Sequence, residues 1–349
     1  METQQSHYFR LVCVYILSAI MVVPMGYAEV PNSTAIGFSS PYGVAYDRSN
    51  LYVADRRNHR IQKIAISSGV VTTLAGSTTS GSTDGKGTDA RFYYPSGVAC
   101  DGKGNLYVVD QNNNMIRKIV ISTGIVTTLA GSISNGRADG TGTIAHFSNP
   151  YGITYDVAGN LYVTDSGNNK IRKISIATGE VTTLAGSGSW SSTDGSGTTA
   201  SFFCPAGIVS VGRGNLYVAD LGGCKIRKIA ISKGEVSTMA GNGKNGFTDG
   251  ICTEASFYNP IGVASDGLGN LYVTDSGNNK IRKISITTGV VSTLAGSGSV
   301  GSTDGVGTTA SFNDPIGIAY DGLGNLYVTD SGNNKIRKIV ISTGIVSTL

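Results

Sequence analysis

The feature that most constrains the fold of this chain is a short stretch that returns at a fixed interval. The residues GNLYVTDSGNNKIRKI occupy positions 159–174 and recur unchanged at 269–284 and 324–339. Looser copies lie at 49–64, 104–119 and 214–229. One aspartate marks each copy, at a constant spacing of 55 residues: Asp55, Asp110, Asp165, Asp220, Asp275 and Asp330. A fixed period of this length indicates stacked supersecondary units.

Each repeat is expected to form four short β-strands. In the third copy, runs rich in Val, Ile, Leu, Tyr and Thr are separated by clusters of Gly, Asp and Asn, which favour tight turns. The expected strands cover 150–155, 160–164, 170–176 and 180–185, and a long loop over 186–204 leads to the next repeat. Strands this short with turns this frequent exclude a helical solenoid.

The sheets are expected to close into a ring. A single four-stranded sheet cannot bury both of its faces, whereas in a ring each sheet packs between two neighbours. The six copies therefore predict an all-β protein, a six-bladed β-propeller of four-stranded antiparallel blades over residues 38–349. On the third strand of a repeat, we expect Arg172 and Lys173 to lay their aliphatic stems along the next blade and to hold their charges at its edge.

The repeat resembles a known family. Its pattern is Phe-x-x-Pro-x-Gly-Ile-Ala, then Gly-Asn-Leu-Tyr-Val-x-Asp, then Asn-x-Lys/Arg-Ile, and it occurs six times between Phe38 and Leu349. This pattern is similar to the NHL repeat. The resemblance implies a β-propeller of the kind used mostly as an interaction platform, with a few secreted enzymes on related six-bladed scaffolds. Because one fold hosts many functions, the pattern says more about fold than about function.

The first 28 residues differ from the repeats. Arg10 precedes the apolar run Leu11–Val23, and Pro24, Gly26 and Ala28 follow it. This run is short for a bilayer span and has the layout of a secretory signal peptide; an uncleaved membrane anchor is the alternative. We therefore expect a signal peptide over 1–28, a tail over 29–37 and a propeller over 38–349. The mature protein is expected outside the cell without a membrane span, with Asn32 as a glycosylation site.

The charge of the chain gives little sign of a nucleic-acid partner. Charged residues make up 14% of the sequence and the formal net charge is +4. A nucleic-acid-binding domain would be expected to carry a clustered basic face. A protein or a glycan is the expected partner.

The repeated aspartates are interpreted as structural turn residues. Each stands at the start of a turn, where a carboxylate can accept backbone N–H groups, and six identical copies suit a scaffold better than a single catalytic site. The long loops repeat a Thr-Asp-Gly sequence, for example at 193–195. Each copy offers one carboxylate, whereas calcium takes six to eight oxygen ligands. We therefore expect a turn there, and no metal site.

The long loops are expected to build one broad face beside the turns that contain the repeated aspartates. Long loops inside a compact domain are often functional. Residues that break the repeat on this face are the candidates for ligand binding, since exposed aromatic and Arg side chains are typical anchors of interfaces. They are Arg56, Arg57, His59, Tyr93, Tyr94, Trp190, Phe203, Lys244 and Phe247. For Tyr93 and Phe203, a role as plugs between blades is the alternative.

A catalytic site is not evident. After residue 28 the chain has two histidines, His59 and His146, whereas catalytic zinc usually has three protein ligands. No nucleophile–base pair stands out. The expected function is therefore a secreted, non-enzymatic binding platform without a cofactor, which binds a protein or glycan through the long-loop face. The alternative is a metal-dependent lyase or hydrolase with its site in the central channel.

The cysteines after the signal segment are Cys100, Cys204, Cys224 and Cys252. In an oxidising compartment, pairing is expected. The 55-residue period places Cys204 just before the first strand of its repeat and Cys224 in the turn between the second and third strands, on one face of the same blade. We therefore predict a Cys204–Cys224 disulfide. Cys252 is the rival partner, and four unbridged buried cysteines are the alternative.

Overall fold

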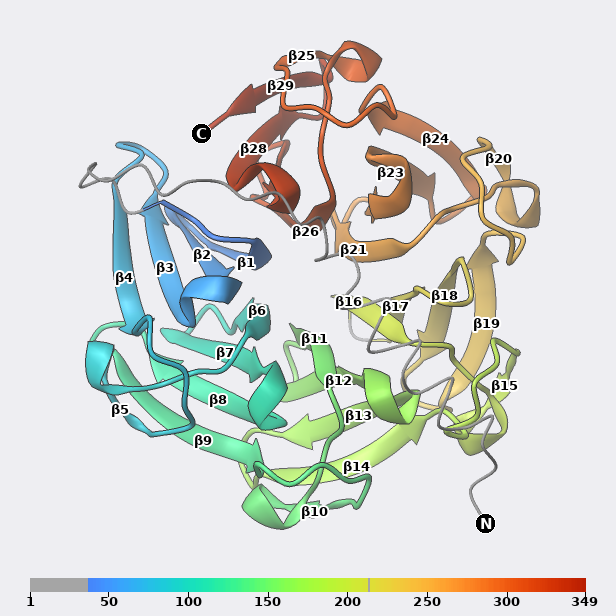
Figure 1. Cartoon of the computed structure of the whole chain (residues 1–349). Coiled ribbons are helices and arrows are strands. Elements are labelled where there is room, and N and C mark those ends of the chain that lie inside the picture. Colours follow the sequence, from blue (N-terminus) through green and yellow to red (C-terminus); the bar gives the residue numbers. More distant parts are fainter. Residues whose placement is uncertain (1–36, 213) are drawn as a thin grey trace. The chain divides into compact units, whose positions relative to one another are not determined.

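Six β-sheets stand around a central axis, and each forms one blade of a propeller (Figure 1). The computed structural model describes residues 37–212 and 214–349, and its main compact unit is Phe38–Leu349. The predicted signal peptide, most of the predicted tail and Asn32 lie outside the described residues. The prediction of an all-β, six-bladed propeller is confirmed.

The strands follow the repeat from blade to blade. Blade one contains β1 (Pro41–Asp47), β2 (Asn50–Asp55), β3 (Arg60–Ala65) and β4 (Val71–Gly76). Blade two contains β5 (Gly85–Lys86), β6 (Pro95–Cys100), β7 (Asn105–Asp110), β8 (Met115–Val120) and β9 (Ile125–Gly131). Blade three contains β10 (Gly140–Thr141), β11 (Pro150–Tyr155), β12 (Asn160–Asp165), β13 (Lys170–Ser175) and β14 (Glu180–Ala185).

The other half of the ring repeats this order. Blade four contains β15 (Gly195–Ser196), β16 (Pro205–Val211), β17 (Asn215–Asp220), β18 (Lys225–Ala230) and β19 (Glu235–Ala240). Blade five contains β20 (Gly250–Ile251), β21 (Pro260–Ser265), β22 (Asn270–Asp275), β23 (Lys280–Ser285) and β24 (Val290–Ala295). Blade six contains β25 (Gly305–Val306), β26 (Pro315–Tyr320), β27 (Asn325–Asp330), β28 (Lys335–Val340) and β29 (Ile345–Thr348).

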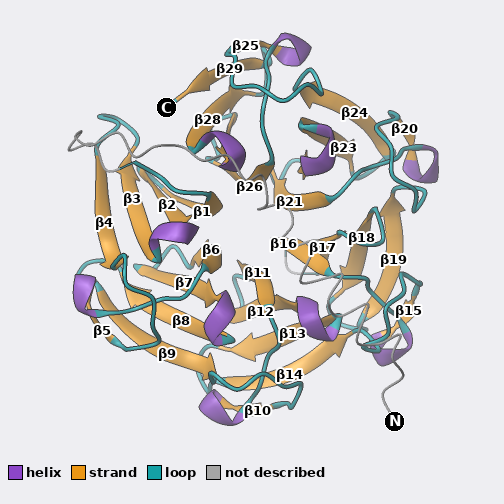
Figure 2. Cartoon of the chain, viewed as in Figure 1, coloured by secondary structure: helices purple, strands orange, loops and turns teal. Residues whose placement is uncertain are grey.

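Short 3-10 helices occur at two distances from the central axis. Those that follow the second full-length strand of a blade are η1 (Arg56–Asn58), η3 (Gln111–Asn113), η5 (Ser166–Asn168), η8 (Ser276–Asn278) and η10 (Ser331–Asn333). Those of the long loops are η2 (Gly87–Asp89), η4 (Gly142–Ile144), η6 (Gly197–Thr199), η7 (Cys252–Glu254) and η9 (Gly307–Thr309). Figure 2 shows the first group near the axis and the second group at the rim.

The expectation of four strands in every blade needs a correction. Blades two to six have five strands, and blade one has four among the described residues. The extra strand comes from the long loop that precedes the blade: β5, for example, pairs antiparallel with the start of β9. The loop thus crosses from one blade to the outer edge of the next and ties the two together. Before β1 only residues 37–40 are described, and no such strand lies among them.

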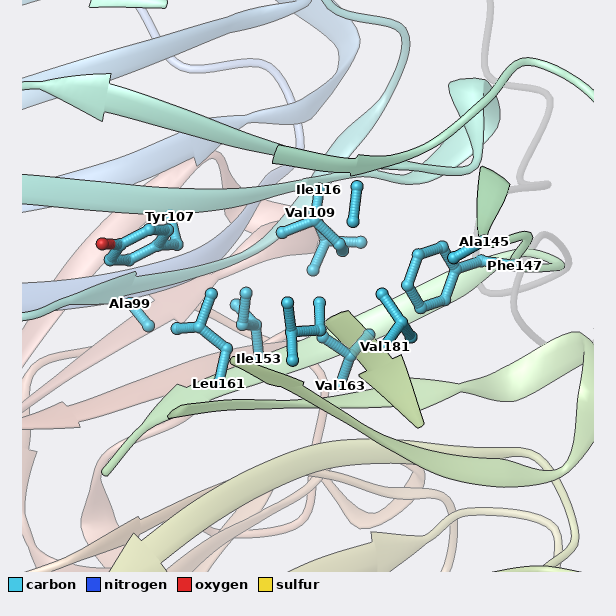
Figure 3. Packing of buried hydrophobic residues seen from close by; sticks show 12 residues of the cluster. Ala99, Tyr107, Val109, Ile116, Ala145, Phe147, Ile153, Leu161, Val163 and Val181 are labelled. Atoms are coloured by element: carbon cyan, nitrogen blue, oxygen red, sulfur yellow. The ribbon is translucent and has the colours of Figure 1, made fainter. Parts of the chain in front are cut away.

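The hydrophobic core lies between the blades. Between blades two and three, Val109 and Ile116 face Leu161, Val163 and other buried side chains (Figure 3). Phe147 belongs to the same cluster and is fully buried. Similar clusters fill the next interfaces around the ring. Each blade therefore buries both faces against its neighbours, and removal of this apolar surface from water favours the ring.

The innermost strands approach so closely that they require glycine. A Cβ atom on Gly43 would lie 2.3 Å from the Ser96 carbonyl oxygen of the next blade. On Gly152 it would lie 2.4 Å from the carbonyl oxygen of Ala206. The glycine two residues after the first proline of each repeat therefore sets how tightly the strands pack around the axis.

The arginine of the third full-length strand is buried, which corrects the expectation for Arg172. Its side chain has no exposed surface, and Nη1 lies 2.7 Å from Asp165 Oδ2. Nη2 lies 2.7 Å from Asp139 Oδ1, which belongs to the preceding long loop. The guanidinium also stacks over Phe147 with 5.1 Å to the ring centroid. The same arrangement surrounds four further buried arginines: Arg117, Arg227, Arg282 and Arg337.

Polar side chains also join each blade to the next. In blade three, Asn169 Oδ1 accepts the Cys204 backbone N–H at 2.8 Å. Thr164 donates its hydroxyl to the Ala206 carbonyl oxygen at 2.6 Å. Sequence-equivalent contacts are made at other interfaces around the ring. The inter-blade contacts are therefore a property of the repeat.

Candidate functional site

One mouth of the central channel carries the residues that depart most from the repeat. We define the axial mouth by the first residue of each turn after β2 and its equivalents, and by the residue before the first proline of each repeat. The first set is Arg56, Gln111, Ser166, Leu221, Ser276 and Ser331. The second set is Ser40, Tyr94, Asn149, Cys204, Asn259 and Asp314, all with positive φ. Because serine occupies the first set in blades three, five and six, Arg56 is the largest departure.

Arg56 is buried at this mouth, with 4% of its surface exposed. Its guanidinium carbon lies 4.3 Å from the centroid of the Tyr42 ring and 5.2 Å from that of Tyr94. Nη1 donates to Gln111 Oε1 of blade two, and Gln111 Nε2 donates to Asn149 Oδ1 at 2.6 Å. Among the described residues no carboxylate forms an ion pair with Arg56. The Arg56 guanidinium and the side-chain amides of Gln111 and Asn149 therefore form one chain of hydrogen bonds across blades one, two and three.

Two tyrosines lie on the axis beside this cation. Tyr42 and Tyr151 are 1% and 4% exposed, and their ring centroids are 5.6 Å apart. Neither hydroxyl meets the distance and angle limits of a hydrogen bond with any described residue, although the two hydroxyls face each other closely enough for each to shift the pKa of the other. Burial raises the pKa of both side chains, so both hydroxyls keep their protons and can donate.

Both tyrosines line a small axial cavity of about 80 Å³. Its other walls are the inner strands, including the side chains of Ser96, Ile261 and Ile316. Aliphatic side chains below it, such as Ile153 and Ile208, also line a second cavity of about 260 Å³ toward the opposite mouth. These aliphatic side chains therefore lie between the axial cavity and the second cavity, which we call the lower cavity.

The lower cavity carries hydroxyl groups and one thiol. Tyr46, Tyr155 and Tyr320 line it together with Cys100 and Ser265. Burial raises the pKa of the Cys100 thiol strongly, so this cysteine is not poised as a nucleophile. No group of three or more His, Cys, Asp or Glu side chains that could hold a metal ion occurs among the described residues.

Asp314 is the acidic member of the axial mouth. Burial raises the pKa of its carboxyl to about 7, although Ser276 donates a hydrogen bond to it. Its backbone N–H donates to Asn279 Oδ1 of blade five at 2.9 Å. Asp314 therefore carries little charge below neutral pH and is not a fixed counter-ion at this mouth.

Four of the predicted binding residues form one cluster. The His59 ring makes edge contacts with Tyr93 and Tyr94 at centroid distances of 5.7 and 4.8 Å, and the two tyrosine rings stack at 5.1 Å. His59 Nδ1 accepts the Tyr94 backbone N–H at 3.2 Å. Partial burial, together with the charge of Arg56, lowers the pKa of His59. The cluster Arg56, His59, Tyr93 and Tyr94 thus bridges blades one and two.

The other predicted residues are placed separately. Trp190 and Phe203 meet edge to face, with ring centroids 5.8 Å apart, and both lie in the loop that leads to β16 of blade four. Lys244 and Phe247 lie on the next long loop, where Phe247 is 66% exposed. Arg57 is exposed, and its backbone N–H donates to the Ser39 carbonyl oxygen. No ring contact among the described residues joins Trp190, Phe203, Lys244 or Phe247 to the Arg56 cluster.

The repeated aspartates are fully buried. Asp165, for example, accepts the Ser148 backbone N–H at 2.8 Å and the Asn168 side-chain amide at 2.9 Å, besides its ion pair with Arg172. The loop aspartates of the Thr-Asp-Gly sequences, and Asp139 of the variant Ala-Asp-Gly, supply the second carboxylate to the five buried arginines of the third full-length strands. All of these contacts are internal to the scaffold.

The predicted Cys204–Cys224 disulfide is not formed in this structure, because Cys224 carries a free thiol. The prediction placed both residues correctly on one face but paired them within one blade. The turn position of a blade instead contacts the next blade: the Cys204 N–H donates to the side-chain oxygen of Asn169, and the Asn259 backbone N–H lies near the Cys224 thiol and lowers its pKa against the larger effect of burial. The Cys224 thiol lies 2.9 Å from Asn245 Oδ1.

Sequence reasoning missed Tyr42, Tyr151 and Asp314. The signal was present in the residue that follows the first proline of each repeat, which is Tyr42, Ser96, Tyr151, Ala206, Ile261 and Ile316. This position changes from polar or aromatic in blades one to three to aliphatic in blades four to six. Comparison of the repeats position by position therefore shows the asymmetry of the axial mouth.

Comparisons with known proteins agree with the repeat pattern. A family model described as NHL repeat matches residues 38–64, 147–174, 257–284 and 312–339. The Arabidopsis thaliana protein SUPPRESSOR OF QUENCHING 1, chloroplastic, is 32% identical over 322 residues, which cover 87% of this chain and 30% of that protein. NHL repeat-containing protein 2 of Gallus gallus is 29% identical over 347 residues, which cover 88% of this chain and 47% of that protein.

A solved structure supports the fold. An auxiliary nutrient binding protein from Bacteroides thetaiotaomicron superposes with a TM-score of 0.65 at 19% identity, covering 89% of this chain and 70% of that one. At this identity the likeness concerns the fold. The chain spans less than half the length of the two relatives from Arabidopsis thaliana and Gallus gallus. No helix in the described part of the chain is long and apolar enough to cross a membrane.

Proposed function

Because the chain is an NHL-repeat protein folded as a six-bladed β-propeller, we propose that it is a secreted, non-enzymatic binding platform. Its ligand is a protein or a glycan, bound at the long-loop face. We define this face by the axial mouth and the adjoining tips of the long loops. The apolar run and cleavage pattern over residues 1–28 support export.

The observation that carries this proposal is the gathering of Arg56, His59, Tyr93 and Tyr94 in one cluster. Aromatic and Arg side chains dominate the binding energy of many interfaces. The repeated arginines and aspartates form ion pairs within the scaffold. This cluster instead breaks the repeat and has no equivalent in the described parts of the other blades. An auxiliary nutrient binding protein has the same fold, which agrees with a binding role.

The test compares two faces of the full chain. Glycan arrays and displayed peptide libraries are screened first with the wild-type protein. The strongest ligand is then measured against a long-loop-face variant, Tyr93→Ala with Phe247→Ala. The matched control is Leu268→Ala with Leu323→Ala, which removes two leucines that are 82% and 80% exposed in turns on the opposite face.

We expect the long-loop-face variant to weaken binding by at least about tenfold, or ~1.4 kcal/mol, and the control to leave it unchanged. Loss of binding in the control alone would contradict the proposal. Chemical conversion of the bound ligand, detected by mass spectrometry, would instead support a lyase or hydrolase.

A further inference from the structure

We propose that the axial mouth beside Arg56 binds a carboxylate, held by the Arg56 guanidinium with the Tyr42 and Tyr151 hydroxyls as additional donors. The inference rests on the proposed function and names the chemistry of the group that this face recognises. The carboxylate belongs to a protein ligand, as an acidic side chain or a chain terminus, because Ile261 and Ile316 line the same cavity and offer no side-chain hydrogen-bond partner to the hydroxyl groups of a sugar acid.

The first reason is the unbalanced charge of Arg56. Each of the five buried arginines of the repeat has two aspartates as partners. Arg56 is almost as buried, yet its acceptor among the described residues is one amide oxygen, that of Gln111. A buried cation without a counter-ion costs several kcal/mol, and a bound anion removes that cost.

The second reason is the orientation of the guanidinium. Tyr42 and Tyr94 lie over it at 4.3 and 5.2 Å, and Gln111 accepts from one N–H edge. Rings that pack against a guanidinium fix its plane and satisfy its faces, whereas its N–H edges still need acceptors. A planar carboxylate fits such an edge with two parallel hydrogen bonds.

The third reason is the pair of unpartnered hydroxyls. Tyr42 and Tyr151 are more than nine-tenths buried, and both line the axial cavity of about 80 Å³. A buried hydroxyl without a partner costs free energy, so these groups indicate an acceptor that occupies the cavity. The volume is large enough for several waters or a small organic acid.

The apolar part of the cavity wall narrows the chemistry of the ligand further. Ile261 and Ile316 line the same cavity and contribute no polar side-chain atom. A carboxylate that carries a short aliphatic group would therefore contact donors on one side and methyl groups on the other. Propionate is a small probe with this chemistry.

The test titrates the full chain with sodium propionate and, separately, with propionamide, and follows binding by NMR at about pH 6, where Asp314 is protonated. The key variant is Arg56→Ser, because serine occupies the equivalent position in Ser166, Ser276 and Ser331 and the fold accepts it. Tyr42→Phe and Tyr151→Phe remove single hydroxyls. Arg48→Asn is the matched control, since it removes one exposed positive charge from the opposite face.

We expect propionate to bind the wild type at least about tenfold more tightly than propionamide does. Arg56→Ser should abolish this preference, each Phe variant should weaken propionate binding several-fold, and Arg48→Asn should leave it unchanged. Equal binding of propionate by the wild type and Arg56→Ser, or no binding by the wild type at about 50 mM, would overturn the inference.

The source of the carboxylate is tested with three further probes: a peptide with a free carboxyl terminus, its amidated form with an internal glutamate, and glucuronate. Preference for either peptide would show that the carboxylate comes from a protein. Preference for glucuronate would overturn that source and indicate an acidic glycan. If propionate does not bind but Tyr93→Ala with Phe247→Ala still weakens binding of the screened ligand, the proposed binding platform is supported and the carboxylate site is overturned. If propionate binds but no protein or glycan does, the carboxylate site is supported and the proposed binding platform is overturned.

Discussion

At the scale of single residues, most charges of the repeat serve the scaffold. Arg172 is fully enclosed by Asp165, Asp139 and the Phe147 ring, and four more arginines share this arrangement. In blade one the same strand position is Gln62, which donates to Asp55 Oδ2 at 3.3 Å. The contrast explains why Arg56, which lies outside the repeated network, is the charge of interest for binding.

Loss of one buried arginine should destabilise the propeller strongly. We predict that Arg172→Met lowers the free energy of unfolding by about 3–5 kcal/mol, because it leaves the Asp165 carboxylate buried without its cation. Lys173→Met, on the next residue of the same strand, should change it by less than about 0.5 kcal/mol. Urea denaturation followed by circular dichroism measures both. Equal effects of the two substitutions would contradict the structural role of the ion pair.

Asp314 should make stability depend on pH. Its pKa is about 7 in the folded protein and near the ordinary value of about 4 in the unfolded chain. Because the folded-state pKa is the higher one, stability is complete below pH ~4 and is lost as the pH rises toward ~7. Asp314→Asn, which installs the residue found at Asn149 and Asn259, should therefore be more stable than the wild type by about 2–4 kcal/mol at pH ~8.

The measurement for Asp314 is a series of thermal melts between about pH 4 and pH 8. The two proteins should melt alike at the acidic end and diverge toward the alkaline end. Parallel curves across this range would show that the carboxyl titrates normally.

Candidate binding residues could be predicted from the sequence only where the repeat is broken. Arg56, His59, Tyr93 and Tyr94 stood out as departures, and the structure brings them together. The burial of Arg172 could not be predicted, because its partner Asp139 lies in a loop 33 residues earlier. Tyr42 and Tyr151 escaped notice because tyrosine is an ordinary strand residue; only the ring of blades brings their side chains into contact.

At the scale of elements, the strands of the third repeat could be predicted almost to the residue. The strand expected over 180–185 is β14, and that expected over 170–176 is β13, one residue shorter. The rim strand β15 was missed because it has two residues, Gly195 and Ser196, with little strand propensity. Its pairing with β19 depends on the position of the next blade, which no local pattern encodes.

The turn that contains Cys224 offers a test of the contacts between blades. Asparagine at this position accepts a backbone N–H of the next blade at 2.8 Å in Asn114 and 2.9 Å in Asn279. Cys224 offers sulfur, a weaker acceptor. Cys224→Asn should therefore stabilise the protein by about 0.5–1 kcal/mol, measured by urea denaturation under reducing conditions. Destabilisation would show that the thiol packs better than the amide in this turn.

At the scale of the whole molecule, the ring closes with the same contacts that join consecutive blades. Asn334 Oδ1 of blade six accepts the Ser40 backbone N–H of blade one at 2.7 Å. Thr329 donates its hydroxyl to the Tyr42 carbonyl oxygen at 2.6 Å. Blades one and six are not consecutive in the described part of the chain, and side-chain and packing contacts hold this interface there.

Removal of these contacts should open the ring at this interface first. In Thr329→Val with Asn334→Ala, we expect amide hydrogen exchange in β1 to rise by about tenfold or more, since local opening follows the loss of about 1.4 kcal/mol or more. The matched variant is Thr274→Val with Asn279→Ala between blades five and six, where the chain connection persists. Comparable exchange at both interfaces would contradict closure by these contacts.

The central claim is that the long-loop face, around the axial mouth, is the binding surface of this propeller. Hydroxyl-radical footprinting of the full chain, with and without the strongest ligand from the screen, tests it most directly. We predict that the ligand protects Tyr93, Phe247 and Trp190 from oxidation and leaves Leu268 and Leu323 unchanged. Protection of Leu268 and Leu323, with Tyr93 and Phe247 oxidised as in the free protein, would place the ligand on the opposite face and contradict the account.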